Sequence, residues 1–154
     1  AEVRVLVAED DMISQRVMVK MMSTHGIRNV DVVGNGAEAL ERVKDAGNCY
    51  NLLLMDWNMP TMDGLAATQA MRREVPAERL PHIVILTAAA MSGDREQCLA
   101  AGADEYLTKP ISRQAMEALF RKLGRREADK AEAVAVAAAA DDKNVAAAAG
   151  ASGV

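Results

Sequence analysis

The sequence is poor in aromatic residues and in long apolar runs, and each shortage excludes a class of protein. Only 3% of the 154 residues are aromatic, which argues against a surface that stacks the bases of single-stranded nucleic acid. No apolar run approaches the roughly 18 residues of a membrane span, and no charged-then-apolar signal segment opens the chain. The net charge is −4, so we expect no general binder of nucleic-acid phosphates.

Cysteine is also scarce, which helps to predict whether the protein works in an oxidising or a reducing compartment. Cys49 and Cys98 are too few for a disulfide scaffold and lack C-x-x-C spacing. We therefore expect two reduced thiols and a cytoplasmic setting. The chain begins at Ala1 without a methionine, from which we expect a processed product or an excised piece of a longer protein.

Composition divides the chain near Gly124. Hydrophobic residues make up 51% of the whole, but residues 125–154 are rich in alanine and have almost no large apolar side chains. Alanine favours helix, yet a helix without an apolar face has nothing to dock. We predict a folded domain over residues 1–124, followed by an alanine-rich tail over 125–154 that is a frayed helix or disordered.

The first 124 residues alternate between strand and helix patterns. We predict strands at 3–8, 30–33, 51–55, 82–86 and 105–107, and helices at 12–25, 37–46, 64–73, 92–101 and 111–123. Such alternation predicts an α/β fold, in which a doubly wound parallel sheet of five strands carries helices on both faces.

Polar residues follow four of the five predicted strands. Because the carboxyl ends of parallel strands meet at one edge of a sheet, we expect these residues to converge there. They are Glu9, Asp10 and Asp11 after the first strand, Asp56 after the third, Thr87 after the fourth and Lys109 after the fifth.

The carboxylates in this set favour a bound cation. Two like charges about 4 Å apart repel by roughly 4 kcal/mol at an effective dielectric constant near 20, and a cation would relieve that repulsion. Oxygen donors without histidine or cysteine suit Mg²⁺, whereas calcium is disfavoured because no EF-hand spacing is present. A carboxylate beside Mg²⁺, a lysine and a hydroxyl predicts phosphoryl transfer onto the carboxylate. Nucleotide binding is disfavoured, because no glycine-rich loop follows the first strand.

Four segments carry these residues in a fixed order, at residues 5–11, 55–64, 85–88 and 101–110. In this order the chain resembles the receiver domains of response regulators in two-component and phosphorelay signalling, most of all the receivers of hybrid sensor histidine kinases. The resemblance covers residues 3–123. It implies a flavodoxin-like (βα)5 fold with strand order 2-1-3-4-5.

The resemblance also implies an acceptor and a metal site. Asp56 would accept a phosphoryl group from a phosphohistidine. Mg²⁺, with Mn²⁺ as a substitute, would be bound by Glu9, Asp10, Asp56 and the backbone carbonyl of Asn58. Because three acids run together, a shift of one residue would make Asp10 and Asp11 the acidic pair. We favour Glu9 and Asp10, with Asp11 as the cap of the first helix.

Further roles carry over by position. Thr87 and Lys109 would contact phosphoryl oxygens, and Thr87 and Tyr106 would form the conformational switch. The peptide bond between Lys109 and Pro110 would be cis. Candidates for contact with the phosphodonor are Met12, Ile13 and Pro110.

The implied partners are a histidine kinase or a histidine phosphotransfer domain upstream, and a protein or domain downstream. We expect no enzyme beyond self-phosphorylation and dephosphorylation, and no segment of this chain that binds nucleic acid or crosses a membrane. One alternative is an aspartyl-phosphate hydrolase of the haloacid dehalogenase type. Those enzymes have an aspartate two residues after the nucleophile, where this chain has Asn58. The other alternative is a receiver-like module that binds proteins independently of phosphorylation.

Overall fold

The computed structural model describes residues 2–152, with side chains as far as residue 140. The chain divides into two compact units, residues 1–112 and 113–154. The strands of the first unit are β1 (Arg4–Ala8), β2 (Asn29–Val33), β3 (Leu52–Asp56), β4 (His82–Thr87) and β5 (Glu105–Thr108). Its α-helices are α1 (Met12–Thr24), α2 (Gly36–Lys44), α3 (Gly64–Glu74) and α4 (Asp94–Ala101), with a 3-10 turn at Ala77–Arg79.

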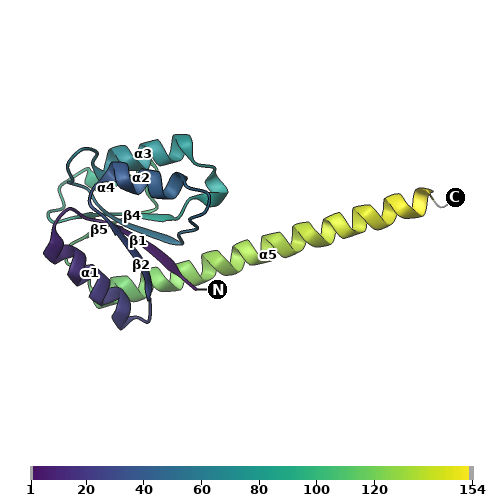
Figure 1. Cartoon of the computed structure of the whole chain (residues 1–154), viewed down its shortest axis with the longest axis horizontal. Helices are drawn as coiled ribbons and strands as arrows, with labels where there is room; N and C mark the ends of the chain where they lie inside the picture. The colour runs from purple at the N-terminus through teal and green to yellow at the C-terminus, as the bar shows by residue number, and fades with distance from the viewer. Residues whose placement is uncertain (1, 153–154) are drawn as a thin grey trace. The chain divides into compact units, whose positions relative to one another are not determined.

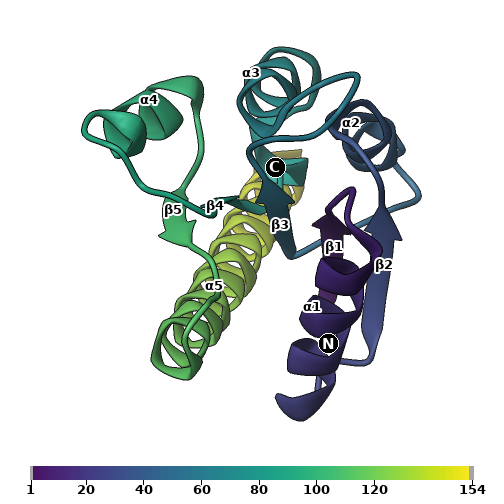
Figure 2. The same ribbon diagram turned by 90° about the vertical axis from the view of Figure 1, so that its left-hand side faces the viewer.

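The five strands form one parallel sheet in the order β2-β1-β3-β4-β5, which confirms the predicted fold class and strand order. Helix α1 lies on one face of the sheet, and α2, α3 and α4 lie on the other (Figures 1 and 2). The strand order reverses between β1 and β3, because the chain passes from β1 outward to β2 and then returns to the other side. Ligand sites of such sheets form at the carboxyl ends of strands beside this reversal.

The core of the first unit is centred on β3 and β4. All four residues from Leu52 to Met55 are fully buried, as are Ile83, Val84 and Ile85. Each large apolar side chain of this kind contributes about 1.5–3 kcal/mol when it is fully buried. The periphery differs, because α4 buries only one of its residues, Cys98.

Short polar side chains fix where the first three helices begin. Asp11, Asn35 and Asp63 are the N-caps of α1, α2 and α3, and each accepts a hydrogen bond from a backbone N–H three residues later, at 2.8–2.9 Å. Helix α4 starts at residue 94 rather than at the predicted 92, because Gly93 has a φ of +89°, in the left-handed region that ends or precedes helices.

The second unit is one helix, α5 (Arg113–Ser152), which begins two residues later than predicted and does not end at residue 123. Met116, Leu119 and Leu123 are buried, whereas Val134 and Val136 are exposed. The helix passes Gly124 because alanine and charged helix formers on either side offset the roughly 1 kcal/mol cost of glycine. Of the two alternatives predicted for 125–154, a frayed helix or disorder, the structure shows helix as far as Ser152, and residues 153–154 lie outside the described residues. The division at residue 124 stays a prediction.

None of the helices in the described part of the chain combines the length and the apolar character needed to cross a membrane.

Candidate functional site

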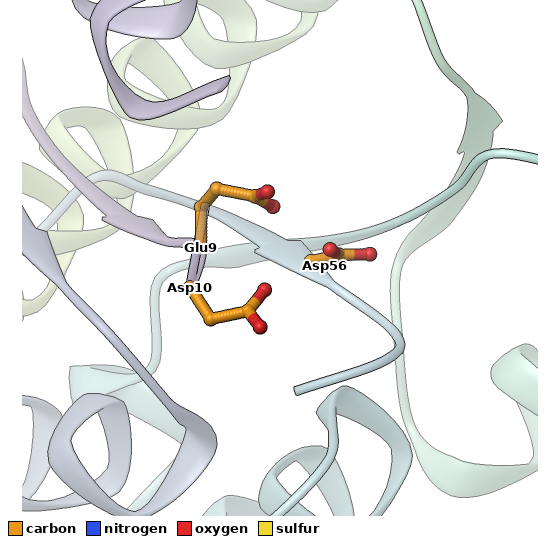
Figure 3. A group of neighbouring side chains, drawn as sticks. All are labelled: Glu9, Asp10 and Asp56. Atoms are coloured by element: carbon orange, nitrogen blue, oxygen red, sulfur yellow. The ribbon is translucent and has the colours of Figure 1, made fainter. Parts of the chain in front are cut away.

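Three carboxylates from the ends of β1 and β3 point into one region (Figure 3). Glu9 and Asp10 follow β1, and Asp56 is the last residue of β3; one carboxylate oxygen of each lies within 4.8 Å of those of the other two. Glu9 is buried, Asp56 is half-buried and Asp10 is exposed. The two strand ends are level because β1 and β3 pair in register, with Ala8 beside Met55.

Lys109 places a positive charge against two of these carboxylates. Its Nζ lies 2.8 Å from Oε2 of Glu9 and 3.1 Å from Oδ2 of Asp56. The backbone N–H of Lys109 donates to the carbonyl of Thr87 at 2.7 Å, which ties the segment after β5 to the end of β4. The bond between Lys109 and Pro110 is cis, as the resemblance implied. No equivalent ion pair to Asp10 is found among the described residues.

The electrostatics of this cluster follow from burial and crowding. Burial raises the pKa of Glu9, the hydrogen bond from Lys109 works against that rise, and the neighbouring Asp56 adds to it. Burial alone would lower the pKa of Lys109, but its hydrogen bonds to Glu9 and Asp56 outweigh that effect and raise it. The lysine therefore stays charged at neutral pH, while ionisation of Glu9 carries a free-energy cost that a further cation would reduce.

The geometry separates Asp11 from the other two acids of its run. Asp11 is exposed, and its side chain accepts the backbone N–H of Ser14 at 2.8 Å as the N-cap of α1. That hydrogen bond lowers the pKa of the Asp11 carboxyl. The carboxylates grouped with Asp56 are those of Glu9 and Asp10, and the role of these two residues as the acidic pair of a metal site stays a prediction.

The loop from Asp56 to α3 is held tightly beside the acidic cluster. The N–H of Gly64 donates to the carbonyl of Trp57 at 2.8 Å, and a Cβ at Gly64 would lie 2.5 Å from the carbonyl oxygen of Asp56. Only glycine fits this approach. Thr61, in the same loop, has a φ of +69°. Asn58 is exposed within the loop, two residues after Asp56, and its carbonyl stays a predicted metal ligand.

The predicted switch residues lie on the two strands beyond β3. Thr87 ends β4 and is buried; its hydroxyl donates to the carbonyl of Ala89 at 3.3 Å. Tyr106 on β5 is also buried, and its hydroxyl donates to Oδ2 of Asp94 at 3.4 Å. Its ring meets that of Trp57 edge to face, with centroids 6.3 Å apart. Burial, together with Asp94, raises the pKa of Tyr106. The aromatic side chain therefore points inward in this structure.

The predicted contacts for a phosphodonor are all accessible. Met12 and Ile13, at the start of α1, are 64% and 73% exposed, and Pro110 is exposed next to Lys109. Their role stays a prediction.

Two neighbours of the site were not identified from the sequence. Gln15 on α1 donates its side-chain amide to the carbonyl of Glu9 at 2.6 Å, and Asp94 on α4 accepts from Tyr106. The position of Gln15, one turn into a helix that follows the acids, could have suggested a contact with the preceding loop. Nothing in the sequence pairs Asp94 with Tyr106.

Comparison with known proteins places this geometry in one family. The response regulator receiver domain matches residues 5–121. The two-component system protein A of Emericella nidulans is 38% identical over 78% of this chain, which spans 17% of that relative's length. Other relatives are named hybrid signal transduction histidine kinases, from Dictyostelium discoideum.

Solved structures agree in fold and in sequence. The receiver domain of a sensor histidine kinase from Pseudomonas aeruginosa, with a magnesium ion coordinated in its active site cleft, is 35% identical with a TM-score of 0.70, covering 80% of this chain and 99% of that one. A receiver domain of a downstream response regulator from Saccharomyces cerevisiae, in complex with a histidine phosphotransfer protein, is 28% identical with a TM-score of 0.64, covering 79% and 86% of the two chains. The chain therefore belongs to the response regulator receiver domain family of two-component signalling.

Proposed function

We propose that Asp56 accepts a phosphoryl group from a phosphohistidine in a reaction that requires Mg²⁺. The observation that carries this proposal is the set of three carboxylates within 4.8 Å of one another, with the ammonium of Lys109 against two of them. A carboxylate at a fixed strand end, beside a lysine and a site for a cation, is suited to attack a phosphorus atom.

The residues fit a magnesium ion. All the donors are oxygen atoms, and Mg²⁺ prefers a few carboxylates together with water. Glu9, Asp10 and Asp56, with the backbone carbonyl of Asn58, would hold it, and Mn²⁺ would be a substitute. The related receiver from Pseudomonas aeruginosa, which contains magnesium in its active site cleft, supports this assignment. When bound, the ion offsets negative charge on the phosphoryl oxygens.

Transfer of the phosphoryl group from phosphohistidine to Asp56 needs no further reactant. An oxygen of the Asp56 carboxylate forms a bond to phosphorus while the phosphorus–nitrogen bond of phosphohistidine breaks. The electron pair of the broken bond remains on the imidazole nitrogen, and Asp56 becomes a mixed anhydride. Lys109, already 3.1 Å from Asp56, would hold one phosphoryl oxygen, and the hydroxyl of Thr87 would hold another.

The expected consequence is a change in protein contacts. Phosphorylation adds roughly one to two negative charges at the end of β3. Thr87 would turn toward the new group, and inward placement of Tyr106 would be favoured, which shifts a pre-existing equilibrium. The altered surface would recruit a downstream protein or domain in the cytoplasm.

The donor would be a histidine kinase or a histidine phosphotransfer protein docked on Met12, Ile13 and Pro110. Their exposure supports this docking, as does the yeast relative bound to a histidine phosphotransfer protein.

Intact-mass spectrometry tests the proposal. Wild type, Asp56→Asn and the control Asp129→Asn, an exposed acid on α5, would be incubated with Mg²⁺ and phosphoramidate. We expect one base-labile phosphoryl adduct on wild type and on Asp129→Asn, none on Asp56→Asn, and none in the presence of EDTA. Absence of an adduct on wild type, both with phosphoramidate and with a phosphorylated histidine phosphotransfer protein, would favour the phosphorylation-independent binding module. An adduct on Asp56→Asn would place the acceptor elsewhere.

A further inference from the structure

Gln15 bridges the stretch of main chain that carries Asp10. Its side-chain amide donates to the carbonyl of Glu9 at 2.6 Å, while its own backbone N–H donates to the carbonyl of Asp11 at 2.9 Å. One residue of α1 therefore contacts the peptide group that joins Glu9 to Asp10 and, beyond Asp10, the carbonyl of Asp11. The acid between them belongs to the cluster drawn in Figure 3.

The main chain at Asp10 lies beyond the hydrogen-bond ladders of the sheet. The ladders that pair β1 with β2 and β3 end at Ala8. Beyond that point the N–H of Glu9 still reaches the carbonyl of Val33 at 3.0 Å, but its carbonyl lies past the last ladder pair. The amide of Gln15 supplies the donor that a neighbouring strand would supply farther back in the sheet.

The rest of the turn is closed by the start of α1. The Asp11 side chain caps Ser14 at 2.8 Å, so the helix begins directly after the acids. Gln15 is half-buried on this helix, which itself packs on the sheet. The hydrogen bond of Gln15 therefore ties the main chain at Glu9 to a helix and not to a flexible loop. The Asp10 carboxylate itself is exposed and has no ion pair to Lys109.

We propose that Gln15 is a positioning residue for the cation site, because its side-chain amide fixes the main chain from which Asp10 projects. The inference rests on the proposed function, since it names Mg²⁺ as the ion that the carboxylates take up. Magnesium tolerates little departure from octahedral geometry, so a carboxylate ligand whose position varies lowers the affinity for Mg²⁺. Groups that orient a metal ligand in this way commonly affect metal binding without touching the metal.

The first test is a Mg²⁺ titration followed by the fluorescence of Trp57, the only tryptophan of the chain, which directly follows Asp56. Gln15→Met keeps the length of the side chain but removes its donor, and Gln15→Asn keeps an amide that is one methylene too short. Gln69→Met, at an exposed site on α3, is the matched control. We expect the dissociation constant for Mg²⁺ to rise about three- to tenfold in both Gln15 variants, as loss of one hydrogen bond predicts, and to stay unchanged in the control.

A second readout separates positioning from a general structural role. Phosphorylation of each variant by phosphoramidate would be followed over a range of Mg²⁺ concentrations. We expect the half-saturating Mg²⁺ concentration to rise by the same factor while the rate at saturating Mg²⁺ stays within about twofold of wild type, because excess metal restores occupancy. Thermal melting in EDTA shows that each variant is folded. If Gln15→Met fails to fold, Gln15→Asn carries the test.

The outcomes distinguish this inference from the function on which it rests. If wild type binds Mg²⁺ and the folded Gln15 variants bind it equally well, the role of Gln15 is refuted and the proposed function stands. If the variants lose maximal rate at an unchanged Mg²⁺ affinity, the role is also refuted. If wild type does not bind Mg²⁺, the metal-dependent function fails on the wild type itself, and the proposed role of Gln15 fails with it.

Discussion

Replacement of Asp10 by asparagine should stabilise the metal-free protein, even though Asp10 belongs to the candidate site. The structure sets its carboxylate near two others, those of Glu9 and Asp56, while Lys109 forms ion pairs only with those two partners in the described part of the chain. Asp10 thus contributes repulsion without a compensating ion pair. Its removal leaves the two pairs of Lys109 intact.

The magnitude follows from the separation and the exposure. Two unit charges 4.8 Å apart repel by about 3.5 kcal/mol at an effective dielectric constant of about 20. Because Asp10 is exposed, water screens each repulsion to the scale of a surface ion pair, about 1 kcal/mol or less. Two such repulsions give an expected gain of about 1–2 kcal/mol, or roughly 2–8 °C in melting temperature for a chain of this length.

The assay is thermal unfolding by circular dichroism in EDTA and again in millimolar Mg²⁺. In EDTA we expect Asp10→Asn to melt highest, and Asp56→Asn to gain less, because that substitution also removes one ion pair of Lys109. Added Mg²⁺ should raise the melting temperature of wild type by mass action and leave that of Asp10→Asn nearly unchanged. The control is Glu78→Gln, which removes an exposed acid in the 3-10 turn. The reasoning is refuted if Asp10→Asn melts at or below wild type in EDTA, or if the control gains as much.

Three further predictions follow from other contacts. Burial raises the pKa of Glu9 above 4.5, so the stability that the protonated group contributes is complete below that value and is lost as pH rises through the raised pKa. Glu9→Gln also removes an ion pair of Lys109, so the prediction concerns the change with pH: the melting temperature of Glu9→Gln relative to wild type should rise between about pH 4 and about pH 8 in EDTA, and a difference that does not change with pH would contradict this. Gly102→Ala should lower the free energy of unfolding in urea by about 2–3 kcal/mol, because φ is +111° and a Cβ would lie 2.6 Å from Cγ of Arg72; a loss below the measurement error would count against it. Thr61→Asn should raise that free energy by about 0.5–1 kcal/mol, because asparagine tolerates the left-handed region better, and a destabilised variant would disprove the argument.

The sheet was predictable because its strands are strongly patterned. The apolar run from Leu52 to Met55 predicts a buried strand, and the structure buries all four residues. In the first unit the predicted bounds differ from the observed ones by two residues or fewer. The strand order came from the resemblance, since periodicity alone does not determine which strands are neighbours.

Other features depended on information that the sequence does not carry locally. Three consecutive acids look alike in a sequence, and only the cap that Asp11 makes to Ser14 separates it from Glu9 and Asp10. The predicted fifth helix ends at residue 123, whereas α5 continues to Ser152, and the sequence left open whether the alanine-rich tail is a frayed helix or disordered because helix propensity and the lack of a docking face point in opposite directions. The contact of Gln15 with Glu9 depends on the direction that α1 takes after β1, and the residue types at these positions do not determine that direction.

The unequal burial of β3 and α4 has a consequence for where motion can occur. The strand that ends in Asp56 is surrounded by fully buried residues, so its amide hydrogens exchange with water only when much of the unit opens. Helix α4 buries only Cys98 and is joined to β5 by the hydrogen bond between Tyr106 and Asp94, so we expect it to open locally at a lower free energy than β3. A chemical change at the rigid end of β3 would therefore be followed more readily by a movement of α4 than by a movement of the strand that carries the reacting residue.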